Sequence, residues 1–397
     1  MRRTFPSAVV AGALVALAIP AWSQPPAETE PENCEGAGFM PMPDYQSVEV
    51  LGDGRVTFRI CAPEATTVRL ISSDAADVIP LGFGGETPGL AMSKDDEGLW
   101  TVTTPAPLEV DTLRFVFRVN GVDVADPEGS TVIGGYPGGV SSVVATGRKA
   151  GAFQAYDKNV PHGAISRIEY FSSSLNVKRP AVVYTPPGYM RGDAAYPVLY
   201  LVHGAGDRED GWTAIGRAHY ILDNLIAAGQ AKPMIIVMPL GHTPPRPDAD
   251  MLANTDFSDD LLTDLVPFIE ASFRTVNERG ARAMAGLSMG GAHTMSTGLV
   301  NPDLFAYVGI FSMGLMSAER VDAYEARNAA ALAKASESMK LVYYAMGKTD
   351  FLYGSVAPTR AVFEKHGIAH VYVESEGGHT WANWRDYLAD FLPRLFK

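Results

Sequence analysis

Cysteine is scarce in this sequence, and so are positive charge, metal-binding histidine motifs and long apolar runs. Its 32 lysine and arginine residues face 45 aspartate and glutamate residues, and a net charge of −13 argues against nucleic acid or an anionic membrane as partner. No H-x-x-H or H-E-x-x-H spacing occurs, so we expect no metal and no other cofactor. The apolar stretch at residues 8–19 is too short to span a bilayer, and no other segment is long enough.

The first residues have the composition of an export signal. Arg2 and Arg3 give a positive start, residues 8–19 are apolar, and residues 21–23 (AWS) offer a cleavage site. We therefore expect residues 1–23 to be a signal peptide and the mature protein to be secreted or periplasmic. The paired arginines leave Sec and twin-arginine export both open.

The only two cysteines, Cys34 and Cys61, lie close to the start of the predicted mature chain. In an oxidising compartment we expect them to form a disulfide that pins the N-terminal arm to a strand. Neither is a candidate nucleophile, because no histidine lies near them in the sequence.

At 397 residues the chain is too long for one ordinary core, and its texture changes along its length. Residues 24–44, rich in proline and glutamate, are predicted to form an extended arm. Residues 45–146 alternate polar and apolar positions between turn signals, which predicts an all-β immunoglobulin-like sandwich. After a linker at residues 147–160, residues 161–397 alternate apolar strands with helical patterns. That order is typical of a mostly parallel α/β sheet covered by helices on both faces.

The clearest local predictions are apolar runs for strands and amphipathic runs for helices. The predicted strands are residues 55–60, 113–119, 197–202, 234–238, 281–285, 341–346 and 369–373. The predicted helices are residues 259–273, 292–300 and 381–395.

Residues 286–291 (GLSMGG) match the G-x-S-x-G pattern of a nucleophile elbow, between a predicted strand and a predicted helix. Side chains two residues on either side of Ser288 would collide with the neighbouring chain, which explains the glycines. The turn lifts the Ser288 hydroxyl clear of the sheet and aims the helix N-terminus at the reacting centre. Ser288 is therefore the predicted nucleophile.

Two further residues follow predicted strands in the order that a serine hydrolase needs. Asp350 follows the strand at 341–346, and His379 follows the strand at 369–373. The carboxyl ends of parallel strands meet at one edge of the sheet, so these side chains can converge on Ser288. His379 is the predicted base and Asp350 the acid that orients it, with Asp322 and Glu376 as alternative acids.

The remaining histidines near this region have ordinary explanations. His366 lies on a predicted surface helix, His370 inside a predicted strand, and His293 on the helix after the elbow, where we expect it to pack.

An oxyanion hole needs two backbone N–H groups directed at one point. The first is expected from Met289, the residue after the nucleophile. The second is expected from the turn at residues 203–207 (HGAGD), whose small residues let the backbone approach a substrate, and Ala205 is the preferred donor. His203 is then a structural residue of that turn.

Five segments in this order resemble carbohydrate esterase family 1. They are YPVLYLVHGAGDREDGW, DFSDDLLTDLVPFIEASF, AGLSMGG, GKTDFLY and EGGHTWANWRDYL, and the likeness runs from about residue 161 to the C-terminus. This group of feruloyl and acetylxylan esterases also resembles esterase D, the mycolyltransferases and the siderophore trilactone esterases. The resemblance implies an α/β-hydrolase fold with Ser288 as nucleophile, Asp350 as acid, His379 as base, and Ala205 and Met289 as oxyanion donors.

The N-terminal part also has a resemblance. The segments VTFRICAPEATTVRL, DDEGLWTVT and FRVNGVDVADP are similar to carbohydrate-binding-type modules that precede catalytic domains in glycogen-branching enzymes and some esterases. Trp100 and Tyr136 are the candidates for stacking on sugar rings. The alternative is a module that docks or positions and binds no glycan itself.

These observations predict a secreted serine carboxylic-ester hydrolase, most consistent with a feruloyl or acetylxylan esterase acting on plant cell-wall oligosaccharide or a small ester. Trp212 and Trp381 are candidate pocket-lining residues. An enterobactin-type siderophore esterase is the alternative, although only Arg208, Arg217 and Arg246 offer the positive charge that its anionic substrate favours. A glycan-binding protein with an inactive hydrolase domain, and an acyltransferase, stay open as well. The oligomeric state cannot be predicted from the sequence.

Overall fold

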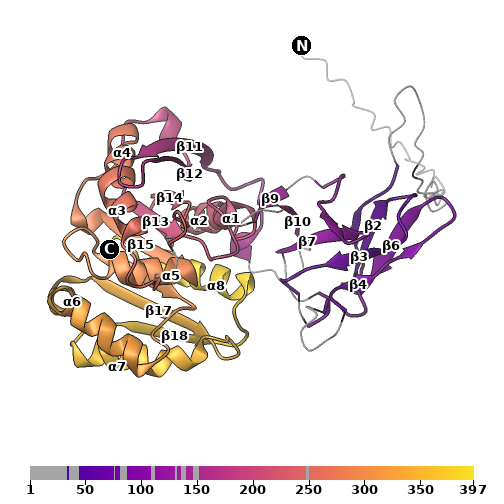
Figure 1. The fold of residues 1–397 in the computed structure, drawn as a ribbon. Helices are drawn as coiled ribbons and strands as arrows, with labels where there is room; N and C mark the ends of the chain where they lie inside the picture. Colours follow the sequence, from indigo (N-terminus) through magenta and orange to yellow (C-terminus); the bar gives the residue numbers. More distant parts are fainter. Residues whose placement is uncertain are drawn as a thin grey trace, which may run out of the picture.

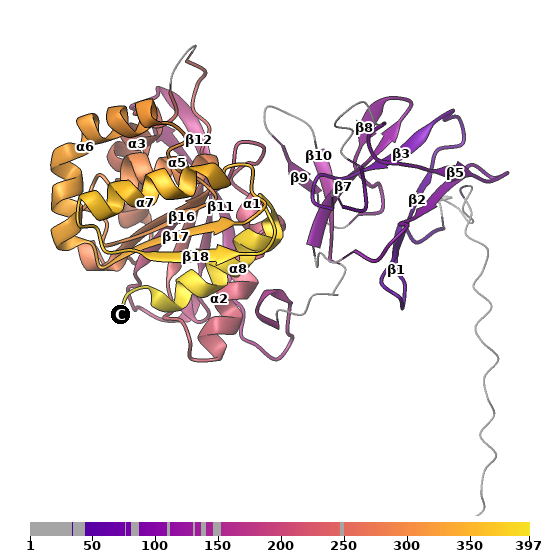
Figure 2. The ribbon, with the colours of Figure 1, turned by 90° about the horizontal axis from the view of Figure 1, so that it is seen from below.

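The computed structural model describes residues 34, 44–75, 77–80, 87–108, 112–129, 132–135, 140–145, 152–246 and 250–397. The predicted signal peptide, most of the predicted arm and Tyr136 lie outside these residues. The described chain forms a β-rich N-terminal part and a larger α/β C-terminal part, which lie side by side (Figures 1 and 2).

The N-terminal part consists of two antiparallel sheets whose inner faces pack together. One sheet has the order β1-β2-β6-β5; the other has the order β4-β3-β7-β10-β9, with β8 paired to β7. Their apolar faces meet because side chains alternate along each strand: Phe58 of β2 and Phe115 of β7 lie with ring centroids 4.9 Å apart in the core. The strands are β1 (Val48–Val50), β2 (Val56–Cys61), β3 (Val68–Ile71), β4 (Leu90–Ala91), β5 (Ser93–Lys94), β6 (Leu99–Thr103), β7 (Thr112–Val119), β8 (Val122–Val124), β9 (Val132–Gly134) and β10 (Val140–Ala145).

Trp100 does not serve as the sugar-stacking platform that the sequence suggested. Its side chain is buried in the core between the two sheets, and its Nε1 donates a hydrogen bond to the Ala62 carbonyl. A ring that fills the core has no free face to offer a sugar.

The C-terminal part is built on one eight-stranded sheet of order β11-β12-β14-β13-β15-β16-β17-β18. β11, β12 and β14 pair antiparallel, and from β14 to β18 every pair is parallel. This is an α/β-hydrolase-like sheet. The strands are β11 (Ala164–Ser172), β12 (Val177–Thr185), β13 (Val198–Val202), β14 (Ile235–Pro239), β15 (Arg282–Leu287), β16 (Tyr307–Phe311), β17 (Leu341–Gly347) and β18 (Val371–Ser375).

Helices cover both faces of this sheet, which explains why every residue of β13, β14, β15 and β16 is buried. Helices α1, α2 and α8 pack on one face, and α3 to α7 pack on the other. Helix α3 runs through a π-helical stretch at residues 260–265 into α4. The helices are α1 (Gly211–Ala214), α2 (Ala218–Ala227), α3 (Asp256–Asp259), α4 (Val266–Ser272), α5 (Met289–His293), α6 (Ala318–Ser338), α7 (Val356–Lys365) and α8 (Trp381–Phe391).

Most predicted boundaries in the C-terminal part differ from the structure by one or two residues. The helix after the elbow begins earlier than expected, at Met289, and continues through residues 294–298. His370 was wrongly placed inside a strand, since β18 begins only at Val371. The apolar residues before that point pack on helix α7 instead, as Ile368 does through its place in the buried cluster with Phe363.

The two parts share buried apolar contacts. Ile133 of β9 belongs to the same buried cluster as Trp212 of helix α1, and Val143 of β10 packs against that cluster. Figure 1 shows β9 at the side of the sandwich nearest to α1. The N-terminal part is therefore seated on the helix that follows the 203–207 turn.

Cys34 and Cys61 form a disulfide, which fastens the arm to the end of β2. The bridge closes a loop with a sequence separation of 27. In the chain-entropy description, a loop of this size stabilises the folded state by about 3 kcal/mol.

We expect the Cys34→Ser, Cys61→Ser double variant to lower the free energy of unfolding of the N-terminal part by about 3 kcal/mol. Scanning calorimetry, with and without reductant, measures this. Reductant should shift the transition of the native protein toward that of the variant and leave the variant's transition unchanged. An equal midpoint for native protein and variant would contradict the expectation.

Candidate functional site

Ser288 lies at the turn between β15 and α5 in a backbone conformation that few side-chain-bearing residues adopt. Its φ is 52° and its ψ is −116°. Two glycines allow this turn: a Cβ on Gly286 would lie 2.4 Å from the Gly290 backbone, and a Cβ on Gly290 would lie 2.3 Å from the Val202 carbonyl oxygen. Strained backbone of this kind persists only where the surrounding structure enforces it, and it collects at functional sites.

His379 and Asp350 form a close pair on the loops that follow β18 and β17. The Nδ1 atom of His379 lies 3.0 Å and 2.9 Å from the two carboxylate oxygens of Asp350. An ionised carboxylate only accepts hydrogen bonds, so Nδ1 carries the proton and Nε2 keeps its lone pair. The ring is therefore in the tautomer that a general base needs.

The environment of Asp350 favours its ionised form. Burial opposes ionisation, but hydrogen bonds from the His379 ring, the Leu352 backbone N–H and the Ser312 hydroxyl outweigh burial and lower the pKa of Asp350. Ser312 is itself fully buried and accepts a hydrogen bond of 2.9 Å from the Trp384 indole. The carboxylate thus stays charged and fixed beside the histidine.

Ser288 and His379 line one cavity of about 320 Å³. These two side chains, both within the described part of the chain, are not hydrogen-bonded to each other, as is common for catalytic pairs without a substrate. The C-terminal part contributes Gly204, Ala205, Gly206, Asp207, Leu287, Phe351, Trp381 and Trp384 to the wall, and the N-terminal part contributes Ser73, Asp74 and Arg114. Both parts of the molecule therefore contribute to the cavity that Ser288 lines.

The turn after β13 places small residues at the edge of this cavity. The Asp207 N–H donates to the Gly204 carbonyl at 3.1 Å, so that Ala205 and Gly206 form the tip of the turn. Met289 opens helix α5, where the first backbone N–H groups have no acceptor within the helix. The two N–H groups expected at the oxyanion hole thus come from segments that flank Ser288.

His203 stabilises the 203–207 turn through hydrogen bonds and does not act as a base. Its Nδ1 donates to the Gly204 carbonyl at 2.7 Å, and its Nε2 accepts from the Gly241 N–H at 2.9 Å. Complete burial lowers the pKa of His203 to about 3, so the ring is neutral. Burial likewise lowers the pKa of His293 to about 4; this ring packs flat on Phe257 and bonds the Gly241 carbonyl, as expected of a packing residue.

The two tryptophans proposed as pocket residues differ in position. Trp212 is fully buried, donates through Nε1 to the Val202 carbonyl, and does not line the cavity. Trp381 lines the cavity but is only 1% exposed, so it supports the wall from behind. Sequence could not separate these cases, because both tryptophans lie in the first turn of a helix on the same face of the sheet.

The alternative acids lie elsewhere. Asp322 is exposed on helix α6. Glu376 is exposed and pairs with Lys348 rather than with the histidine.

Sequence reasoning missed several cavity residues, among them Phe351, Trp384 and Arg114. Phe351, directly after Asp350, is 72% exposed, and its ring lies 4.4 Å from that of His379. Trp384 meets the His379 ring edge-on at 5.0 Å. Arg114 comes from β7 of the N-terminal part. The position of Phe351 next to the predicted acid was a usable signal, whereas nothing in the sequence connects Arg114 with this site.

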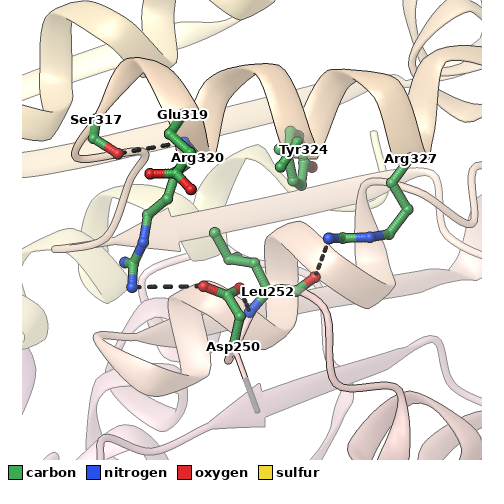
Figure 3. A pocket seen from close by; sticks show the side chains of 8 residues that line it. Asp250, Leu252, Ser317, Glu319, Arg320, Tyr324 and Arg327 are labelled. Atoms are coloured by element: carbon green, nitrogen blue, oxygen red, sulfur yellow. Dashed lines mark hydrogen bonds and ion pairs between the residues drawn. The ribbon is translucent and has the colours of Figure 1, made fainter. Parts of the chain in front are cut away.

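A second cavity of about 310 Å³ lies beside helix α6 (Figure 3). Its two arginines interact with groups of the cavity itself: Arg320 lies 3.5 Å from Asp250, and Arg327 donates to the Leu252 carbonyl. No serine–histidine pair faces this cavity among the described residues. These contacts hold residues 250–252 onto α6.

The structure and the comparisons agree on the class of protein. The sheet order and the serine elbow are those of an α/β-hydrolase-like enzyme. Residues 172–395 match the family described as "Putative esterase", which is more than half of the 397 residues. The chain belongs to this esterase family.

An endo-1,4-beta-xylanase/feruloyl esterase of Xylanibacter ruminicola is 32% identical over 369 residues, covering 90% of this chain and 47% of that protein. An esterase of Mycobacterium tuberculosis is 27% identical over 265 residues, covering 59% of this chain and 55% of that protein. The chain thus spans about half the length of these curated relatives. An alignment of 369 residues also extends into the N-terminal part.

Among solved structures, a ferulic acid esterase is 26% identical with a TM-score of 0.52, covering 58% of this chain and 97% of its own. The enterochelin esterase of Shigella flexneri is 16% identical with a TM-score of 0.61, covering 88% of this chain and 95% of its own. The second likeness concerns the fold alone.

Within the described residues, no helix is long and apolar enough to cross a membrane. The same residues contain no group of three or more side chains suited to hold a metal ion.

The buried histidines predict an acid-sensitive fold. Below about pH 6.5 the unfolded chain protonates His203 and His293, while the folded protein keeps them neutral down to about pH 3 and 4. Their contribution to stability is therefore complete above pH 6.5 and falls as the pH is lowered, by up to about 1.4 kcal/mol per pH unit for each ring.

The amide of His293→Gln can still donate to the Gly241 carbonyl but does not titrate. In this variant we expect the free energy of unfolding to fall less steeply as the pH is lowered, by up to about 1.4 kcal/mol per pH unit. Urea unfolding between pH 4.5 and 7.5 measures it. The same slope in native protein and variant would show that His293 does not carry this effect.

Proposed function

We propose that this protein is a secreted serine carboxylic-ester hydrolase that acts through an acyl-enzyme on feruloyl or acetyl esters of hemicellulose. The observation that carries the proposal is the strained Ser288, which shares one cavity with the His379–Asp350 pair. Export through a signal peptide at residues 1–23 is part of the proposal and rests on the sequence.

The chemistry follows from the positions of these groups. Ser288 Oγ attacks the ester carbonyl while His379 Nε2 takes its proton, and the N–H groups of Ala205 and Met289 receive the developing oxyanion. His379 then gives the proton to the leaving alcohol, which yields the acyl-enzyme. Water attacks this intermediate by the same route and releases the acid. Asp350 keeps the ring in its tautomer and stabilises the imidazolium throughout.

We propose that the enzyme prefers esters whose acyl group is aromatic. Phe351 presents an exposed ring beside His379, at a cavity of about 320 Å³. Aromatic acids stack on such rings with a gain of about 1 kcal/mol beyond area burial. The relative named xylanase/feruloyl esterase supports the same substrate class.

The siderophore esterase alternative draws support from the Shigella enterochelin esterase, whose fold likeness spans both parts of this chain. The charges argue against it. Arg114, the arginine in the cavity wall, is flanked by the carboxylates of Asp74 and Asp207. Arg208 and Arg246 pair with Glu209 and Asp256. A strongly anionic substrate would therefore meet little uncompensated positive charge.

The N-terminal part is proposed to be an immunoglobulin-like module of the carbohydrate-binding type. Its two packed antiparallel sheets support that interpretation. Its contribution to the cavity wall favours the positioning role over a separate glycan platform.

Ser288→Ala should reduce kcat on methyl ferulate by about 10⁴-fold or more, because no other nucleophile replaces the hydroxyl. The thermal midpoint should change little, since alanine bears the same backbone strain. Ser166→Ala, at an exposed serine on β11, is the matched control. Retained turnover in Ser288→Ala would refute the mechanism.

The substrate class is tested by kcat/KM of the native protein on methyl ferulate, acetylated xylan and a catecholate trilactone, side by side. We expect one of the first two to be preferred. A preference for the trilactone would favour the siderophore alternative. Binding to xylan with no release of acid from any ester would favour an inactive, glycan-binding protein.

Phe351→Ala should raise KM for methyl ferulate by about 5-fold through the loss of stacking, and leave 4-nitrophenyl acetate hydrolysis nearly unchanged. Phe171→Ala, which removes a 62% exposed ring on β11, is the control. Equal effects of Phe351→Ala on both esters would remove Phe351 from the acyl site.

A further inference from the structure

Arg114 of β7 reaches from the N-terminal part to the turn that carries Ala205. Its Nη1 donates to the Asp207 carboxylate at 2.5 Å. Its Nε and Nη2 donate to the Asp74 carboxylate at 2.9 Å and 2.7 Å, and its backbone N–H donates to the same group at 2.8 Å. One guanidinium thus connects a sandwich loop with a turn of the catalytic part.

Asp207 occupies the structural corner of that turn. Its N–H closes the turn on Gly204, and its side chain is only 7% exposed. Burial and the nearby Asp74 and Asp210 charges oppose ionisation, and Arg114 counters them. A buried carboxylate that loses a cationic partner at hydrogen-bond distance must move toward water or take up a proton. The first change, movement toward water, displaces the backbone at the corner.

The other side of the turn is fixed from within the catalytic part, since His203 bonds the Gly204 carbonyl and the Gly241 N–H. The turn is therefore held from the catalytic part by His203 and by His242, which bonds the Ala205 and Asp207 backbone, and from the other module by Arg114. The tip between the anchors carries the Ala205 N–H. Small displacements of an oxyanion donor are costly because its benefit depends on distance and direction.

We propose that Arg114 is a positioning residue for the oxyanion turn, so that the chemical step at Ser288 depends on the N-terminal part. The inference rests on the proposed ester hydrolysis. Arg114 is not assigned to substrate binding, because its Nε, Nη1 and Nη2 atoms all donate to the two carboxylates. Its effect acts through Asp207, and it should appear in kcat rather than in KM.

Arg114→Met is the first test, on the full chain with 4-nitrophenyl acetate. We expect kcat to fall by about 10-fold to 100-fold with KM changed by less than about 2-fold, because the donor is displaced rather than removed. Arg114→Lys should recover part of the loss, since it keeps the charge but cannot bridge both carboxylates. Arg118→Met is the matched control, because Arg118 lies on the same strand and face and pairs with Asp123 away from the cavity.

A phosphonate gives a readout that general destabilisation would not move. Ser288 Oγ bonds to phosphorus of a neutral 4-nitrophenyl phosphonate, 4-nitrophenolate leaves, His379 receives the hydroxyl proton, and the remaining phosphoryl oxygen occupies the oxyanion hole. The inactivation rate of Arg114→Met should fall by the same factor as kcat, at a temperature where circular dichroism shows the variant folded. An unchanged inactivation rate would overturn the proposal.

Adding Asp207→Asn to Arg114→Met removes the unpaired carboxylate and should restore part of kcat. A double variant whose loss equals the product of the single losses would show that Arg114 does not act through Asp207. The outcomes also separate this inference from the proposed function. If the native protein cleaves no ester, the proposed function fails; if it is active and Arg114→Met matches it, only the role of Arg114 fails.

Discussion

The close approach of three backbone segments at the elbow is the constraint on which the active-site region depends. Strand β13, strand β15 and the first turn of α5 lie so near each other that Gly286 and Gly290 leave no room for a Cβ. This contact forces Ser288 into its positive φ and brings the start of α5 against the chain that leaves β13. Since the 203–207 turn begins one residue after Val202, the nucleophile and the oxyanion turn are set by the same contact.

A second layer of organisation comes from buried charge. Asp350 is ionised because its hydrogen bonds outweigh its burial, and the ionised group fixes the His379 tautomer. Asp207, in contrast, is buried under conditions that raise its pKa to about 6, and it has a partner from another part of the chain. Asp350 is stabilised by groups within the catalytic part. Asp207 is stabilised by Arg114, so the catalytic part depends on the N-terminal part.

The sequence predicted well what local pattern determines. The elbow, the strand-loop order of Asp350 and His379, and the two changes of texture along the chain all follow from residue spacing and composition. The seven strands that were predicted by range lie within two residues of their positions, but β11, β12 and β16 were not predicted. The roles of these residues in catalysis stay proposals, supported by their geometry. The sequence does not determine whether a given aromatic side chain points into a core or into a binding surface. Trp212 and Trp100, both considered as binding residues, are buried in cores.

Arg114 illustrates the deeper reason. Its contact with Asp207 joins residues 93 apart in the sequence and belongs to no periodic pattern, so only the packing of β9 and β10 on α1 brings the two together. Phe351 could have been predicted as a site residue, because it adjoins Asp350. Its exposure, however, depends on how the loop after β17 lies at the cavity.

The position of Ile133 limits how the N-terminal module can be exchanged by recombination or by design. This residue of β9 completes the apolar cluster around Trp212, and that helix directly follows the oxyanion turn. Replacing the sandwich by an unrelated module would uncover this cluster, and a new partner of the catalytic part would need apolar side chains in place of Ile133 and Val143. The composition of the sequence changes near residue 150, but the parts on either side of this boundary share a buried cluster and are not interchangeable modules.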